Sequence, residues 1–214
     1  MVNPLGTSIK NSLAMLRNND EAIARWISHV ISPHVVGVAI TSAVALAFSD
    51  NPLAVFAWLL LLMPLVALPP LGYIFWLVSI GQLEDIYMPE RRSRLGPLTV
   101  LMVWLLICLG LMRYWEAPTI VEMFVLATTV LVGILGLVTL FWKISFHGAT
   151  ITAAATATLL VAGSSAWPVM LLVPLVGWAR VRLRRHTTGQ VICGSLIGAL
   201  IAVFLAQWLL LILV

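Results

Sequence analysis

The feature that most constrains this chain is a series of long segments that contain no Asp, Glu, Lys or Arg. These segments cover residues 26–49, 51–83, 95–112, 123–142, 144–179 and 186–214. A helix of about 20 apolar residues is long enough to cross the hydrocarbon core of a bilayer. The composition agrees, because 62% of the residues are hydrophobic and only 9% are charged. The sequence therefore predicts an integral membrane protein and excludes soluble enzymes, disulfide-rich scaffolds and disordered chains.

The uncharged segments are expected to be helices, because backbone N–H and C=O groups in lipid need partners within their own segment. The period-2 alternation of a membrane β-barrel is absent from them. Residues 144–179 are too many for one span, and Gly, Ser and Pro at 163–168 predict a hairpin of two helices there. Residues 51–83 contain Pro64, Pro69 and Pro70 in their interior, and we interpret the segment as one kinked helix.

These patterns predict an all-α fold, a polytopic membrane helix bundle of about seven spans. The spans are expected at residues 33–49, 53–79, 96–112, 120–141, 147–163, 168–180 and 188–212. An amphipathic stretch precedes them, and its apolar residues, among them Ile23, Trp26 and Ile27, are expected at the membrane surface. The chain is thus divided into an N-terminal interfacial segment, residues 1–32, and a single transmembrane domain, residues 33–214.

The basic residues are distributed very unevenly between the two sides of such a bundle. With seven crossings, the connections at 80–95, 142–147 and 180–187 lie on the same side as the N-terminus. Of the twelve basic residues, all but Arg113 lie on that side: Lys10, Arg17, Arg25, Arg91, Arg92, Arg94, Lys143, Arg180, Arg182, Arg184 and Arg185. The positive-inside rule then predicts a cytoplasmic N-terminus and an external C-terminus. Three separate connections that bring cations to one face indicate a negatively charged ligand.

The first of these connections, residues 85–94, contains three arginines and a carboxylate. Arg91, Arg92 and Arg94 can hold a phosphate group by bidentate hydrogen bonds, and we expect Asp85 to orient them. An ordinary positively charged cytoplasmic loop is the alternative interpretation of these arginines.

The second connection contains Lys143, Ser145 and His147 at the expected start of a helix that is rich in Ala and Thr. The free N–H groups and the dipole of a helix N-terminus favour anions. Small residues also allow neighbouring helices to approach closely. The alternative is a lysine that extends to the membrane surface beside a structural histidine.

The third connection runs from Arg180 to His186 and Gln190, where one expected span ends and the last one begins. It contains three further arginines, and an arginine-rich turn of this kind is most often only a topology signal. A histidine at the helical end of such a turn is less usual.

Together the three connections resemble the type 2 phosphatidic acid phosphatase (PAP2) family over roughly residues 80–200. The pattern Arg180-x5-His186-x3-Gln190 resembles the family's third signature, Ser-Arg-x5-His-x3-Asp. Ser145-Phe146-His147 resembles its second signature, Pro-Ser-Gly-His, and the arginines at 91–94 lie where the first, Lys-x6-Arg-Pro, is expected. Gln190 stands where the family has Asp. No Lys lies seven residues before any of the three arginines, so Lys143 is expected to supply that ammonium group.

The resemblance implies a six-helix core and hydrolysis through a phosphohistidine, without a metal ion or other cofactor. His186 is then the nucleophile, His147 the general acid and Gln190 the residue that orients His186. The substrate phosphate is held by cations and a hydroxyl group, which act on charge that develops on the phosphoryl oxygens. These residues are Arg180, Lys143, Ser145, Arg91, Arg92 and Arg94.

Three functions remain open. The first is a lipid phosphatase that acts on phosphatidic acid, phosphatidylglycerophosphate or a prenyl phosphate or diphosphate in a bacterial or archaeal cell membrane. The second is a weakly active or inactive protein on the same scaffold that binds an anionic lipid or joins a membrane complex, which Gln190 favours. The third is an intramembrane prenyltransferase, but that class needs two acidic clusters for Mg²⁺, and the only one is Glu84, Asp85 and Glu90. No nucleic-acid partner is expected.

Overall fold

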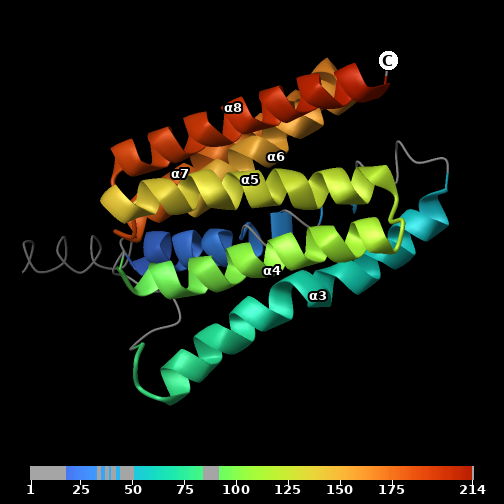
Figure 1. Ribbon diagram of the computed structural model, residues 1–214. Helices are drawn as coiled ribbons and strands as arrows, with labels where there is room; N and C mark the ends of the chain where they lie inside the picture. Colours follow the sequence, from blue (N-terminus) through green and yellow to red (C-terminus); the bar gives the residue numbers. More distant parts are fainter. Residues whose placement is uncertain are drawn as a thin grey trace, which may run out of the picture.

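The computed structural model describes residues 18–32, 35–36, 39, 42–43, 51–83 and 92–213. The regular structure in these residues is helical, which confirms the predicted all-α bundle (Figure 1). Residues 18–30 are helical. The elements that follow are α3 (Pro52–Ser79), the 3₁₀ turn η1 (Arg92–Arg94), α4 (Leu95–Tyr114), α5 (Thr119–Phe141), α6 (Phe146–Ala162), the 3₁₀ segment η2 (Ser164–Leu171), α7 (Leu172–Arg182) and α8 (Thr188–Leu213).

Five of the described helical segments are long and apolar enough to cross a membrane. They are Pro52–Ser79, Arg92–Tyr114, Thr119–Phe141, Ser164–Arg182 and Thr188–Trp208. Each coincides with a predicted span. The apolar helix α6 corresponds to the span predicted at 147–163 and has 17 residues. Most of the span predicted at 33–49 lies outside the described residues, so the total of seven stays a prediction.

Both unusual segments fold as the sequence indicates. Helix α3 continues for 28 residues through its three internal prolines, and the Asn51 side chain caps it by accepting the N–H of Ala54 at 3.1 Å. The long segment 144–179 breaks at Gly163, whose φ of 73° is in the left-handed region that glycine adopts without strain. The predicted hairpin is therefore formed by α6 on one side and by η2 and α7 on the other.

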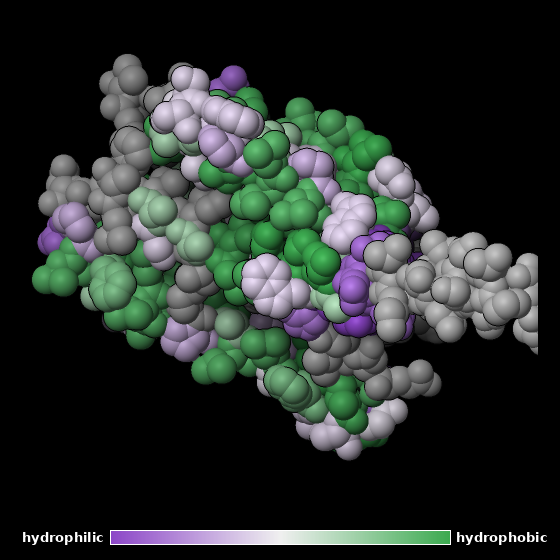
Figure 2. Space-filling model, turned by 180° about the vertical axis from the view of Figure 1, so that it is seen from behind, coloured by the Kyte–Doolittle hydropathy of each residue, from purple (hydrophilic) through white to green (hydrophobic). Residues whose placement is uncertain are grey.

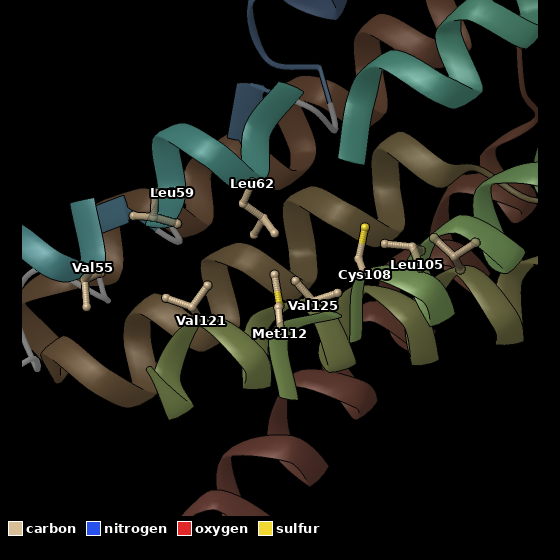
Figure 3. Packing of buried hydrophobic residues seen from close by; sticks show 9 residues of the cluster. Val55, Leu59, Leu62, Leu105, Cys108, Met112, Val121 and Val125 are labelled. Carbon is tan, nitrogen blue, oxygen red and sulfur yellow. The ribbon is translucent and has the colours of Figure 1, made fainter. Parts of the chain in front are cut away.

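An apolar cluster joins α3, α4 and α5 (Figure 3). Its fully or almost fully buried side chains are Val55, Leu59, Leu62, Leu105, Cys108, Met112, Val121, Val125 and Val132. The outward faces of the helices carry large apolar side chains, and Figure 2 shows a flank that is mostly hydrophobic. The strongly hydrophilic residues on this flank gather chiefly at one end, as expected for helices whose sides face lipid.

Helices α6 and α8 pack so closely that only glycine fits between them. A Cβ atom built at Gly198 would lie 2.1 Å from the carbonyl O of Ala149, and one at Gly194 would lie 2.6 Å from the carbonyl O of Ser145. These glycines form a Gly-xxx-Gly motif, which is typical of close contacts between membrane helices. The contact fixes the start of α6 against the start of α8, where the Ser145 N–H donates to the Gln190 carbonyl at 3.3 Å.

The helix at 18–30 packs against α6 and α7 rather than presenting one apolar face to the membrane surface. Ala24 and Ile27 are 0% and 5% exposed and belong to a cluster with Ile151, Val176 and Ala179. Ile27, which the sequence predicts at the membrane surface, is thus buried against the bundle. Ile23 and Trp26 are exposed.

Candidate active site

The candidate site lies at the end of the bundle where α7 ends and α8 begins (Figure 1). The starts of α4 and α6 and the end of α5 lie at the same end, so the predicted connections meet there. Helix α7 ends in a Schellman motif, in which Arg185 N–H donates to Arg180 O at 3.1 Å and Arg184 N–H donates to Val181 O at 2.9 Å. His186 N–H also approaches Arg180 O, at 3.4 Å. The turn therefore brings Arg180 and His186 close together.

Helix α8 begins with a capping box between Thr187 and Gln190. The Gln190 N–H donates to Thr187 Oγ1 at 3.3 Å, and the Thr187 N–H donates to Gln190 Oε1 at 3.2 Å. The same Oε1 atom lies 3.2 Å from His186 Nδ1. Gln190 therefore caps the helix and contacts the histidine ring with one atom.

This arrangement selects one tautomer of His186. The Thr187 N–H is a donor, so the Gln190 atom that faces it has to be the amide oxygen rather than the nitrogen. That oxygen can only accept from the imidazole, which places the proton of a neutral ring on Nδ1. The Nε2 atom then keeps its lone pair and is available as a nucleophile.

His186 is held in its neutral form by its surroundings. The side chain is 6% exposed, and burial is the main cause that lowers its pKa below the ordinary value. The positive charges of Arg180, Arg94 and Lys143 lower this pKa further, and the hydrogen bond with Gln190 opposes the shift only in part. The imidazole is therefore uncharged at neutral pH.

Four cations converge around this histidine from three connections. Burial lowers the pKa of Lys143, between α5 and α6, and the charges of Arg94, Arg185 and Arg180 lower it further. The Nε atom of Arg180 is buried and has no hydrogen-bond partner among the described residues. A buried donor without an acceptor is costly, so an anion that accepts from it would stabilise the site.

An open pocket of about 350 Å³ lies beside His186, and Arg94 and Arg180 are not among the described residues that line it. It is lined by Lys143, Val181, Arg184, Arg185, His186, Thr187 and Gln190. The pocket therefore combines a neutral histidine with cations, which suits an anionic ligand.

The C-terminal part of the chain matches a known family. Residues 136–212 match the family model of the PAP2 superfamily. We refer to this matched region as the PAP2 domain. No curated protein and no solved structure matched the chain.

The PAP2 domain includes the second and third predicted signatures but not the first. Asp85 and Arg91 lie outside the described residues. Arg92 is exposed in η1, whereas Arg94, two residues later, is one of the cations that act on His186. Of the two arginines of this connection that the structure describes, Arg94 is therefore the one at the PAP2 domain's candidate site.

The structure places the two polar residues of the second signature at the start of α6. Ser145 is completely buried, and its Oγ atom caps α6 by accepting the Gly148 N–H at 3.2 Å. His147 is half-buried in the first turn of α6. Among the described residues that line the pocket, neither Ser145 nor His147 occurs.

Sequence reasoning did not assign Arg184, Arg185 and Thr187 to the site. All three occupy variable positions of the third signature, so the motif alone does not single them out. The available signal was the pair Thr187 and Gln190, because Thr-x-x-Gln before an apolar run is a capping box that predicts where α8 begins. The described residues contain no group of three His, Cys, Asp or Glu side chains that could hold a metal ion.

Proposed function

We propose that this protein is an integral-membrane lipid phosphatase that hydrolyses a phosphomonoester or diphosphate through a phosphohistidine intermediate. One observation carries the proposal: the neutral His186 with its Nδ1 bonded to Gln190, beside the unpartnered Nε of Arg180. A histidine in this state has a nucleophilic Nε2, and the arginine has a free donor for a phosphoryl oxygen.

In the proposed reaction, the Nε2 lone pair of His186 attacks the terminal phosphorus atom, and the bond from phosphorus to the leaving oxygen breaks. That oxygen belongs to the lipid alcohol in a phosphomonoester and to the lipid phosphate in a diphosphate. His147 gives a proton to the departing oxygen. Water then attacks the phosphohistidine, His147 takes a proton from it, and inorganic phosphate leaves. Arg180, Lys143 and Arg94 stabilise the negative charge on the phosphoryl oxygens during both steps.

We expect turnover to be slow but measurable, because Gln190 orients His186 without supplying a negative charge. In a serine protease, replacing the orienting Asp by Asn lowers kcat about 10⁴-fold, largely because the histidine takes the wrong tautomer. Here the Thr187 N–H keeps the Gln190 oxygen toward the ring, so the tautomer is retained. What Gln190 lacks is the negative charge that would stabilise the imidazole as it becomes cationic.

The proposed substrates are phosphatidic acid, phosphatidylglycerophosphate and prenyl phosphates or diphosphates. Their charged groups suit the cations of the pocket, and their tails suit the hydrophobic flank of the bundle. We also propose that the site faces the cytoplasm, since this end carries most of the basic residues.

The test is phosphate release by the purified protein in detergent, with EDTA present, from each of these lipids. His186→Ala is the inactive variant, and His29→Ala, an exposed histidine on the helix at 18–30, is the matched control. Release that survives EDTA, persists in His29→Ala and disappears in His186→Ala is the expected result. Trapping of ³²P on the wild-type chain but not on His186→Ala would identify the intermediate.

A second function is favoured by the missing carboxylate at position 190. A PAP2-like protein without catalysis would bind an anionic lipid at the same cations or serve as a subunit of a membrane complex. A folded protein that binds these lipids but releases no phosphate from any of them would favour this function and reject the phosphatase.

A further inference from the structure

The helix at 18–30 is bound to the last turn of α7 by ion pairs. Arg182 Nη1 lies 3.1 Å from Glu21 Oε1, and Arg182 Nε lies 3.9 Å from Asp20 Oδ2. The Arg182 and Glu21 side chains are only 22% and 30% exposed, so this pair is better shielded from salt than an ordinary surface pair. Arg182 follows Arg180 by two residues, and the pair therefore restrains the turn that carries the buried arginine.

Apolar contacts extend the same interface along α7. Ala24 and Ile27 share a buried cluster with Val176 and Ala179, which lie on the last two turns of α7. Ala179 is completely buried and immediately precedes Arg180. The backbone that sets the position of Arg180 is thus packed against the N-terminal helix.

Helix α7 depends on such neighbours, because it has only 11 residues. A helix shorter than about 12–15 residues is marginal in isolation and takes its stability from packing. Its other side is held by α8, where Val191 lies close to Gly177. The N-terminal helix and α8 together enclose the last turns of α7.

We propose that the helix at 18–30 positions Arg180 for its ligand, and that Glu21 and Arg182 are the positioning residues. This inference rests on the proposed function, since it assigns Arg180 to the substrate phosphate. The proposed positioning residue Glu21 lies outside the PAP2 domain at 136–212, on a helix more than 100 residues earlier in the chain. Neither positioning residue is required to touch the substrate.

The test compares four variants with the wild type: Glu21→Gln, Arg182→Gln, the charge exchange Glu21→Arg with Arg182→Glu, and the control Arg25→Gln. The charge exchange also carries Asp20→Asn, so that the new glutamate does not face the Asp20 carboxylate. Arg25 is an exposed cation on the same helix, so the control removes a charge without touching the pair. KM, kcat and the Kd for inorganic phosphate are measured, and thermal unfolding in detergent checks that each variant is folded.

We expect each single variant of the pair to raise both KM and the phosphate Kd roughly tenfold, which is the cost of weakening one charged hydrogen bond. The charge exchange should restore most of this loss, and Arg25→Gln should match the wild type. A merely structural role would lower the fraction of active protein, and with it the apparent kcat, but would leave KM and Kd unchanged.

The outcomes separate this inference from the proposed function. An active wild type in which Glu21→Gln and Arg25→Gln have the same KM and Kd overturns the positioning role and leaves the phosphatase intact. A wild type that binds phosphate but hydrolyses no lipid rejects the phosphatase, and the positioning role is then decided by the Kd values alone. A tenfold loss that the charge exchange does not restore also counts against the ion pair.

Discussion

The Oε1 atom of Gln190 lies 3.2 Å from His186 Nδ1 and also accepts the N–H of Thr187. One uncharged side chain thereby begins helix α8 and fixes the tautomer of the proposed nucleophile. Where the resemblance places an Asp, this chain therefore has a residue that contacts the imidazole through an oxygen atom but carries no charge. Variants at position 190 can therefore test the orientation of the ring separately from the effect of a negative charge on the catalytic rate.

Restoring the carboxylate should increase turnover. We expect Gln190→Asp to raise kcat roughly tenfold, because a charged acceptor stabilises the imidazole as it becomes cationic. Gln190→Glu has the same length as Gln and preserves the capping box, so it tests the charge with the least change in geometry. Gln190→Leu removes the acceptor and should abolish activity. An equal or lower rate in both acidic variants, with unfolding temperatures unchanged, would reject the orienting role.

The acid limb of the pH profile should lie below the usual range of histidine. The nucleophile is active only when it is neutral, and it becomes protonated as the pH falls through its pKa. Burial and the neighbouring cations lower that pKa from the ordinary value of 6.5, so kcat/KM should persist at acidic pH. A carboxylate at position 190 favours the charged ring, and Gln190→Glu should shift the limb to higher pH. A wild-type limb at or above 6.5 would contradict the neutral, buried state of His186.

Arg184 is in a backbone conformation that suits glycine better than arginine. Its φ of 53° lies in the left-handed region, at the position of the Schellman motif that is usually Gly. Arg184→Gly should stabilise the folded protein by about 1 kcal/mol, whereas Arg184→Ala loses the same charge and retains the strain. Thermal unfolding in detergent compares the two variants. Equal unfolding temperatures would show that the turn is not strained by the arginine.

The span positions and the third signature were predictable from the sequence because they depend on local features. Uncharged runs identify α3, α4, α5 and α8 through their length alone, and the spacing from Arg180 to His186 does not depend on how the chain folds elsewhere. The docking of the N-terminal helix was not predictable. It carries apolar residues on more than one face, and lipid tails are as apolar as leucine, so hydrophobicity cannot distinguish a face toward lipid from one toward protein. For this reason the sequence predicts Ile27 at the membrane surface, whereas in the structure Ile27 is buried against the bundle.

The close approach of α6 and α8 depends on tertiary structure in the same way. The Gly-xxx-Gly spacing is visible in the sequence, but the partner of α8 is not. The role of Ser145 also depends on this contact, because its hydroxyl group caps α6 next to the start of α8. Its residue type was consistent with phosphate binding as well as with capping.

Sided labelling can decide the orientation that we propose. In a background without Cys108 and Cys193, Ser165→Cys places an exposed thiol in η2, at the end opposite the site, and Gln82→Cys places one after α3, at the site end. If the site faces the cytoplasm, a membrane-impermeant maleimide added to intact cells labels the cysteine at 165 and leaves the one at 82 unlabelled. Labelling at 82 alone would reverse the orientation.

Enlarging Gly198 should separate α6 from α8 and disturb the site from a distance. A Cβ at this position would meet the backbone carbonyl of Ala149, and a backbone atom cannot move aside as a side chain can. We expect Gly198→Ala to destabilise the protein by about 1–3 kcal/mol, the usual cost of overpacking. Gly110→Ala on α4 is the matched control, since a Cβ there would meet no atom within 4 Å. Because the start of α6 is held against Gln190, Gly198→Ala should also weaken phosphate binding. If Gly198→Ala proves as stable as Gly110→Ala, the two helices can move apart without cost and the close contact is not required.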